Sequence, residues 1–238
     1  MYFSNNTLKD YRFGNNEQPV RFQDLTSYVG VVDRLKENLH FYEKYYILDG
    51  DRPDQLSYKL YGASDHYWMF YLLNDHIRER GWPLSENRLV EKVKLDYPNT
   101  VLTTRDSLTG KFLIGSVVTG SGTGAVGTVL NRNLDLGQLV VSTNDTFSNS
   151  EVITEGVNSV VLVGAVKEHL SIAYYKDASG RRVDIDPYGT PPSNYTPVTW
   201  EEEYRAQNTL LREIKIPKST LVNDIAKIFN EEMKNGYT

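Results

Sequence analysis

Apolar and turn residues divide the middle of the N-terminal half into two short elements. An apolar, aromatic run at residues 45–48 stops at Asp49-Gly50-Asp51, which predicts a strand that ends in a tight turn. Pro53 then begins a segment with helical spacing, and Gly62 ends it. The pattern therefore predicts a strand followed directly by a helix.

Further helices are expected on both sides of this pair. Apolar residues at helical spacing predict helices over residues 64–74 and 85–97, and a helical pattern also covers residues 31–42. Residues 1–30 are polar and aromatic without periodicity, and we expect them to form an extended arm.

Residues 100–166 follow a different pattern, in which short runs of Val, Leu, Ile and Thr alternate with glycine. They contain nine of the 17 glycines, and none of the 17 tyrosines lies between Tyr97 and Tyr174. One segment recurs at a constant offset: Phe112 matches Phe147, Val117 matches Val152, Val118 matches Ile153 and Thr119 matches Thr154. We therefore expect a duplicated strand–turn–strand unit in a small antiparallel barrel or sandwich.

The remaining chain predicts a hairpin, a loop and three further elements. Residues 169–175 and 181–185 flank a turn, and residues 187–197 carry four prolines, which indicates an irregular loop. A helix over residues 201–211 and a strand over 212–216 that stops at Pro217 follow. Ser219 then begins an amphipathic helix. Its apolar side carries Leu221, Val222, Ile225, Ile228 and Phe229.

Composition narrows the functional class. The net charge is −5, with both signs mixed along the 238 residues, so the chain lacks the basic patch of a nucleic-acid-binding protein. There is no cysteine, which excludes disulfides and thiolate sites and fits folding in a reducing cytoplasm. No apolar stretch approaches the roughly 18 residues of a membrane span, and the N-terminus has no apolar export signal.

Candidate catalytic and metal-binding groups are sparse. No two of His40, His66, His76 and His169 have metal-ligand spacing, so we expect surface or packing histidines. Asp184 and Asp186 point the same way on a strand. A shared metal ion or proton is one interpretation, and a solvated strand face is the interpretation we favour.

A glycine motif is also better explained by structure than by ligand binding. Gly122, Gly124 and Gly127 match G-x-G-x-x-G, but a strand pattern follows where a dinucleotide site needs a helix. We expect hairpin turns there, and we predict no enzymatic activity, no cofactor and no metal site.

The run from Tyr45 to Asn74 is similar to the LysM pattern. In that pattern a strand ends in Gly-Asp, and a helix, Tyr-Gly, a Trp-bearing helix and a closing Asn follow. The matching residues are Gly50, Asp51, Leu56, Tyr61, Gly62, Trp68 and Asn74. The second LysM strand commonly ends in Ile-Pro, which residues 212–217 would supply, so the module is expected to be discontinuous.

A more specific resemblance combines this run with the segment that follows it. Asp51-Arg52-Pro53-Asp54, Tyr61-Gly62, the Trp68 helix and Trp82-Pro83-Leu84-Ser85 together resemble the baseplate wedge protein 53 family of T-even-type contractile-tailed phages. The resemblance covers residues 42–97 well, residues 204–232 weakly and residues 100–166 not at all. The glycine-rich segment thus departs from the shorter members of the family.

The expected fold class is α+β. It consists of a discontinuous LysM-like βααβ module, an inserted antiparallel β domain and a C-terminal amphipathic helix. The expected parts are an arm (1–43), the first part of the module with the Trp-Pro-Leu turn and a helix (44–99), the β domain (100–166), a hairpin, loop and closing strand (167–217) and the last helix (218–238).

The resemblance implies a structural subunit that joins neighbouring wedge proteins in a ring-shaped hetero-oligomer. Such a subunit belongs to the virion, in the tail baseplate, and is assembled in the host cytoplasm without contact to nucleic acid or membrane. Leu221, Ile225, Ile228 and Phe229 are the candidate residues for docking a partner.

Two alternatives come from other functional classes. A peptidoglycan-binding LysM protein would hold the sugar chain beside residues 50–53 and 74–75. A tail-associated lysozyme would need an acid/base pair in a cleft, and the sequence offers none that we can identify.

Overall fold

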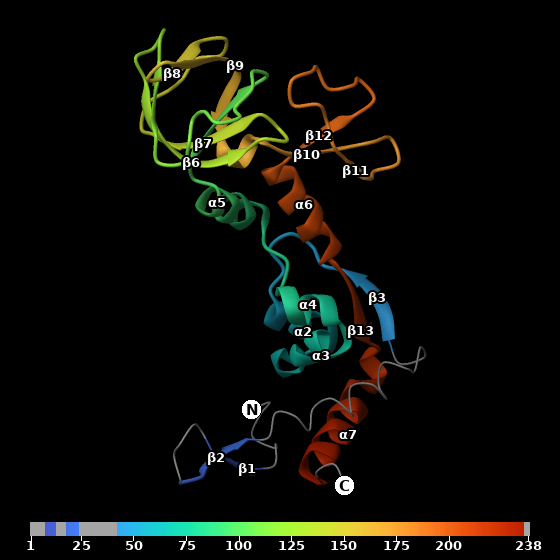
Figure 1. Cartoon of the computed structure of the whole chain (residues 1–238). Coiled ribbons are helices and arrows are strands. Elements are labelled where there is room, and N and C mark those ends of the chain that lie inside the picture. The colour runs from blue at the N-terminus through green and yellow to red at the C-terminus, as the bar shows by residue number, and fades with distance from the viewer. Residues whose placement is uncertain (1–7, 13–17, 24–41, 236–238) are drawn as a thin grey trace. The chain divides into compact units, whose positions relative to one another are not determined.

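The computed structural model describes residues 8–12, 18–23 and 42–235 (Figure 1). It contains two compact units, Met1–Ser85 with Asn208–Thr238 and Glu86–Gln207. The helix expected over residues 31–42 lies outside the described residues except at its last position. We describe each unit by itself.

Unit 1 contains a two-stranded sheet with helices, and a separate hairpin. The sheet and its helices are β3 (Tyr42–Tyr46), α2 (Pro53–Tyr61), η4 (Ser64–His66), α3 (Trp68–Leu73), α4 (Asp75–Arg80), β13 (Glu213–Pro217), η6 (Ser219–Leu221) and α7 (Val222–Asn235). The hairpin pairs β1 (Leu8–Tyr11) with β2 (Val20–Gln23).

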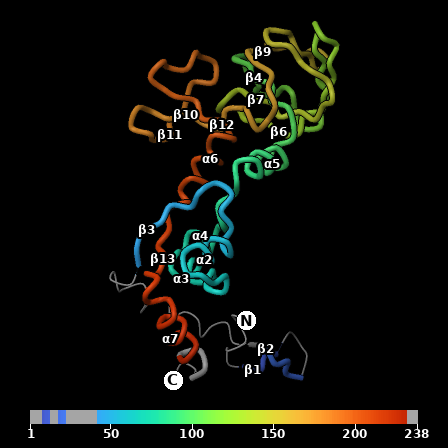
Figure 2. The backbone as a smooth tube through the Cα atoms, turned by 180° about the vertical axis from the view of Figure 1, so that it is seen from behind, coloured from blue at the N-terminus to red at the C-terminus, as the bar shows by residue number. Residues whose placement is uncertain are grey.

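Strands β3 and β13 pair although more than 160 residues separate them, and Figures 1 and 2 both show them side by side. The pairing is antiparallel, with Ile214 opposite Tyr45 and Lys215 opposite Lys44. The pairing of these two segments is therefore confirmed. Strand β3 begins earlier than residues 45–48 predicted, and the turn begins at Leu48, whose N–H donates to the Asp51 carboxylate at 3.1 Å.

The helices after β3 differ from the expected pair. The second predicted helix, residues 64–74, is divided into η4 and α3, and α4 follows it. Asn74 is extended (φ −130°, ψ 96°) between α3 and α4, so it is a corner rather than the end of the helical region. Ile77 of α4 is fully buried, which explains why the chain continues as a helix there.

One side of the sheet packs on the helices to form the core of unit 1. Ile214 and Ile216 of β13 lie with Ile47, Leu56 of α2, Phe70 of α3 and Ile77. The burial of Ile214 and Ile216 confirms which face of β13 is apolar.

Helix α7 does not present a free apolar stripe, contrary to the expectation. Val222, Ile225 and Phe229 are buried against α3 residues Met69, Leu72 and Leu73. The Phe229 ring lies 4.7 Å from the Trp68 ring. The stripe is occupied because α3 carries its own apolar surface, and burying both surfaces removes more area from water than leaving either exposed.

Unit 2 contains a closed six-stranded barrel. Its strands are β4 (Thr100–Thr104), β5 (Val117–Gly120), β6 (Val126–Asn133), β7 (Gln138–Ser142), β8 (Val152–Glu155) and β9 (Asn158–Lys167), in the order β4-β7-β6-β5-β8-β9. All neighbours are antiparallel. The barrel is one of the two architectures that the sequence pattern predicted.

The barrel is internally duplicated, as the sequence repeat predicted. The strands β4, β5 and β6 correspond to β7, β8 and β9. If each strand is replaced by its counterpart, the same six neighbouring pairs result. The repeated residues Thr119 and Thr154 pair directly across β5 and β8. Phe112 and Phe147 are both buried, and at the same offset Gly115 and Ser150 both have positive φ.

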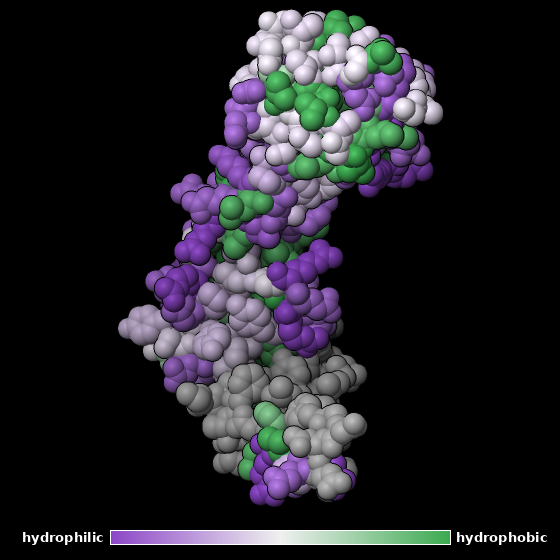
Figure 3. Space-filling view, turned by 60° about the vertical axis from the view of Figure 1, so that its left-hand side comes forward, coloured by the Kyte–Doolittle hydropathy of each residue, from purple (hydrophilic) through white to green (hydrophobic). Residues whose placement is uncertain are grey.

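The outer surface of the barrel carries few charges. The barrel face that Figure 3 brings forward is mostly white and green rather than purple. Val117, Val126 and Val161, on β5, β6 and β9, are about half exposed. The inward residues of the same strands, such as Val118 on β5 and Val129 on β6, are fully buried, so the alternation expected of a barrel is present.

The rest of unit 2 consists of two helices and a small sheet. These elements are α5 (Glu86–Asp96), η5 (Glu168–Leu170), β10 (Ile172–Lys176), β11 (Arg182–Val183), β12 (Thr196–Thr199) and α6 (Trp200–Leu210), the last of which continues into unit 1. The sheet order is β11-β10-β12. Tyr97 stacks on Trp200 at 4.5 Å and contacts Tyr204, which joins α5 to α6.

Candidate functional site

The first three residues of the predicted motif lie in the loop between β3 and α2, and the fourth begins α2. Gly50 has φ 81°, a conformation that L side chains rarely adopt, so glycine is required for the turn. Asp51 accepts a hydrogen bond from the Leu48 N–H and thereby closes the turn. Arg52 forms an exposed ion pair with Asp54 at 3.2 Å, and Pro53 is at the first turn of α2.

Trp82 covers this loop. Its indole N–H donates to the Asp51 carbonyl at 2.7 Å, and its rings lie 5.9 Å from those of Phe70 and Tyr71. Pro83 follows in an extended turn that leads to α5. The Asp-Arg-Pro and Trp-Pro motifs, which are separate in the sequence, thus contact each other through Asp51 and Trp82.

Tyr61 and Gly62 end α2. Gly62 has φ 73°, and its N–H donates to the Tyr58 carbonyl at 2.9 Å, which is a left-handed helix cap. The Tyr61 hydroxyl donates to the carbonyl of Pro217 at 3.0 Å, so it fixes the end of β13. Burial raises the pKa of Tyr61 well above its ordinary value of 10.0, and the hydroxyl stays protonated as a donor.

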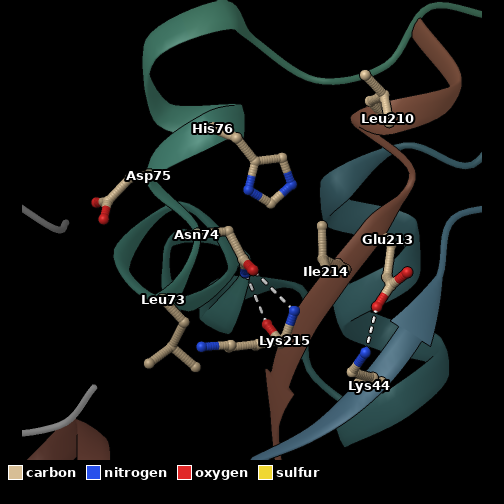
Figure 4. A pocket seen from close by; sticks show the side chains of 9 residues that line it. All are labelled: Lys44, Leu73, Asn74, Asp75, His76, Leu210, Glu213, Ile214 and Lys215. Atoms are coloured by element: carbon tan, nitrogen blue, oxygen red, sulfur yellow. Dashed lines mark hydrogen bonds and ion pairs between the residues drawn. The ribbon is translucent and has the colours of Figure 1, made fainter. Parts of the chain in front are cut away.

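Asn74 connects α3 to β13 and is almost fully buried. Its amide nitrogen donates to the Lys215 carbonyl at 2.7 Å and to the Phe70 carbonyl at 2.8 Å. Its amide oxygen accepts the Lys215 N–H, also at 2.7 Å. Figure 4 shows the two bonds between the Asn74 side chain and β13.

A groove of about 580 Å³ lies beside Asn74 (Figure 4). Its lining residues are Lys44, Leu73, Asn74, Asp75, His76, Leu210, Glu213, Ile214 and Lys215. None of Gly50, Asp51, Arg52 and Pro53 lines it. The groove therefore lacks one of the two loops that a LysM-type carbohydrate site would use.

The groove contains charged groups but no catalytic arrangement that we recognise. Lys44 and Glu213 form an ion pair at 2.6 Å, and the hydrogen bond with Glu213 raises the pKa of Lys44. His76 is partly buried, and its Nε2 has no hydrogen-bond partner. Among residues 8–12, 18–23 and 42–235, no three His, Cys, Asp or Glu side chains are grouped to hold a metal ion.

The four predicted docking residues have different surroundings. Ile225 and Phe229 are buried inside unit 1, and Leu221 packs against the same cluster. Ile228 is 48% exposed and is the residue of the four that lies open at the surface.

No helix in the described part of the chain has the length and apolar character to cross a membrane.

The glycine motif of unit 2 is filled by a side chain of the barrel. Glu151 accepts hydrogen bonds from the N–H groups of Ser148 at 2.6 Å, Thr123 at 3.1 Å and Gly122 at 3.3 Å. Desolvation raises the pKa of Glu151, but these hydrogen bonds outweigh it, so the pKa lies below its ordinary value. The N–H groups that would face a phosphate in a nucleotide site bind this carboxylate instead.

Two residues that the sequence analysis missed hold unit 1 together. Asn208 bonds both the N–H and the carbonyl of Leu84, at 2.8 and 2.9 Å. Arg212 donates to the Ile47 carbonyl and to Asp49, at 3.2 and 2.7 Å. The Arg212 side chain is only 13% exposed. Neither residue had a local sequence signal, because the partners of both are more than 120 positions away.

Comparison with known proteins identifies the N-terminal part of the chain. Residues 20–98 match the family model described as base plate wedge protein 53. The match contains every predicted motif residue from Gly50 to Pro83, and it ends just before β4. None of the curated proteins matches the chain. Through residues 20–98, the chain is therefore similar to the base plate wedge protein 53 family.

Proposed function

We propose that this protein is a structural subunit of the wedge of a contractile phage tail baseplate, which joins neighbouring wedge proteins during assembly. The observation that carries the proposal is the family match over residues 20–98. The partners are other baseplate wedge proteins, in a hetero-oligomeric ring. The site of assembly is the host cytoplasm, and the final location is the tail baseplate of the virion.

The proposed role is structural rather than catalytic. The motif residues Asp51, Tyr61, Asn74 and Trp82 use their polar groups on the protein's own main chain. Groups bonded in this way hold a fold in place, whereas catalytic groups must face a substrate. This use of the motif supports a rigid assembly component.

Unit 1 is proposed to be a discontinuous LysM-like module. The order of β3, α2, the helix pair η4 and α3, and β13 supports the βααβ assignment. Unit 2 enters between α4 and β13. The geometry does not support peptidoglycan binding. Trp82 covers the loop at residues 50–53, and none of these residues lines the groove beside Asn74.

Co-expression with the baseplate proteins encoded beside it in the phage genome tests the function. The chain should co-purify with at least one wedge protein through affinity and size-exclusion steps, in a fixed mass ratio. A chain that elutes alone, while the other wedge proteins assemble without it, would contradict the proposal. Saturable retention on insoluble peptidoglycan would favour the carbohydrate-binding alternative.

A further inference from the structure

The two edges of the β3–β13 sheet differ in how their main-chain groups are satisfied. In an antiparallel pair, alternate residues direct both main-chain groups toward the partner strand. The hydrogen bond from the Ile47 N–H to the Arg212 carbonyl, at 2.9 Å, shows which residues of β3 face β13. Glu43 and Tyr45 therefore direct their groups toward β13, and Lys44 and Tyr46 direct theirs away from it.

The outer edge of β13 is closed by a side chain. Lys215 lies opposite Lys44 and also directs its main-chain groups away from its partner strand. Asn74 bonds both of these groups, at 2.7 Å each. The amide of Asn74 thus replaces a third strand on this side of the sheet.

The outer edge of β3 has no corresponding cover within the described part of the chain. The sheet contains two strands, and no third strand pairs with β3 there. The β3 segment has neither a proline nor a bulge in its register, which are two of the devices that stop an edge strand from pairing. The charged residues that it does carry, Glu43 and Lys44, oppose unspecific pairing and favour a strand of complementary charge. Tyr46 is 53% exposed beside it.

The open face of the sheet indicates the chemistry of a partner. Lys44, Tyr46, Glu213 and Lys215 share this face, and all four are exposed. Two lysines and one glutamate leave one excess positive charge. A strand added beside β3 would lie next to Lys44 and Tyr46, so a carboxylate on that strand would be favoured at this face.

We propose that the free edge of β3 binds an extended, carboxylate-bearing segment of a neighbouring wedge protein by β-augmentation. The inference rests on the proposed function, because the occupant is a wedge protein. Main-chain hydrogen bonds to Lys44 and Tyr46 supply the affinity, and the charged face selects the segment. A second copy of this chain would bring the same positively charged face against itself, which charge complementarity disfavours.

A proline at position 44 tests the edge directly. Lys44→Pro removes an N–H that points away from β13, so the β3–β13 pairing keeps all its hydrogen bonds. Lys44→Ala is the matched control, because it loses the same side chain and the same ion pair with Glu213 but retains the N–H. Full-length wild-type and variant chains are co-expressed with the neighbouring baseplate proteins, and the affinity of the isolated complex is measured.

We expect both variants to unfold at temperatures close to each other and Lys44→Pro to bind about tenfold more weakly than Lys44→Ala, or not at all. Hydrogen exchange at the Lys44 and Tyr46 amides should be fast in the free chain and slow in the complex. Equal binding by the two variants, or fast exchange at both amides in the complex, would overturn the inference alone. Failure of the wild-type chain to join any complex would contradict the proposed function, and the inference would fall with it. Concentration-dependent dimerisation that Lys44→Pro abolishes would identify a second copy as the occupant and also overturn it.

Discussion

Asn74 provides β13 with the two hydrogen bonds that a neighbouring strand would provide. The donor and acceptor of its amide match the carbonyl and N–H of Lys215 at strand spacing, with both bonds at 2.7 Å. An aspartate lacks the donor, and an apolar residue lacks both groups. The closing asparagine of the LysM-like motif therefore has a physical reason in this chain.

Replacement of Asn74 should destabilise unit 1. Asn74→Ala leaves the main-chain groups of Lys215 unpaired beside a nearly buried position, and we expect a loss of about 2–4 kcal/mol of unfolding free energy. Lys215→Ala removes an exposed side chain and its contact with the Tyr42 ring, 4.7 Å away, and should cost less than about 1 kcal/mol. Chemical denaturation of both variants measures the difference. If Asn74→Ala is as stable as Lys215→Ala, the role assigned to the amide is wrong.

Glu151 should make the stability of the barrel depend on pH. Its pKa is lower in the folded chain than the ordinary value of 4.5. A depressed pKa stabilises the folded state above about pH 4.5, and this stabilisation disappears as the pH falls through the folded pKa. Glu151→Gln should therefore be less stable than wild type by roughly 1–3 kcal/mol at neutral pH, and the difference should shrink in acid.

Thermal unfolding at pH 7 and at pH 3 measures this difference. The control is Glu91→Gln, on an exposed position of α5, which should leave the melting temperature unchanged at both values. A difference in melting temperature between wild type and Glu151→Gln that is equally large at both pH values would contradict the lowered pKa of Glu151.

At the scale of elements, periodicity located most helices and strands. The helix that begins at Pro53, the strand that ends at Pro217 and the duplicated β unit all follow from local signals. Two features did not. The corner at Asn74 and the continuation into α4 depend on a bond to residue 215 and on the burial of Ile77, and neither is visible in a local window.

The apolar stripe of α7 shows the same limit of sequence analysis. Amphipathicity identified the apolar face of this helix, which was expected to dock a partner, but it did not identify the surface of this chain that covers it. That surface is α3, which lies about 150 residues earlier in the chain. Of the candidate site, local sequence signals therefore predicted the turn at Gly50 and the helix end at Gly62. The cover of α7 and the hydrogen bonds of Asn208 and Arg212 required the three-dimensional structure.

Two adjacent residues of β13 test whether this strand closes the core of unit 1. Ile214 is 1% exposed, and Lys215 lies on the open face. Ile214→Lys places a charge among Ile47, Leu56 and Phe70, and should cost several kcal/mol, against less than about 1 kcal/mol for Lys215→Ala. Equal midpoints of the two variants in urea would mean that β13 does not close the core of unit 1.

At the scale of the whole molecule, unit 2 should fold by itself. The barrel closes on itself, and a closed barrel leaves no strand edge that needs another part of the chain. Residues 86–207, expressed alone, should give a cooperative thermal transition and a circular dichroism spectrum rich in β structure. A spectrum of a disordered chain would show that unit 2 depends on unit 1.

The composition of purified tails shows whether this protein is a built-in part of the tail baseplate. Quantitative mass spectrometry of tails isolated from mature virions should find the chain at a constant ratio to the other wedge proteins. That ratio should survive washing at high salt, because a subunit that joins wedges is held by the assembly. Absence of the chain from purified tails, or a ratio that falls with each wash, would contradict the proposed structural role.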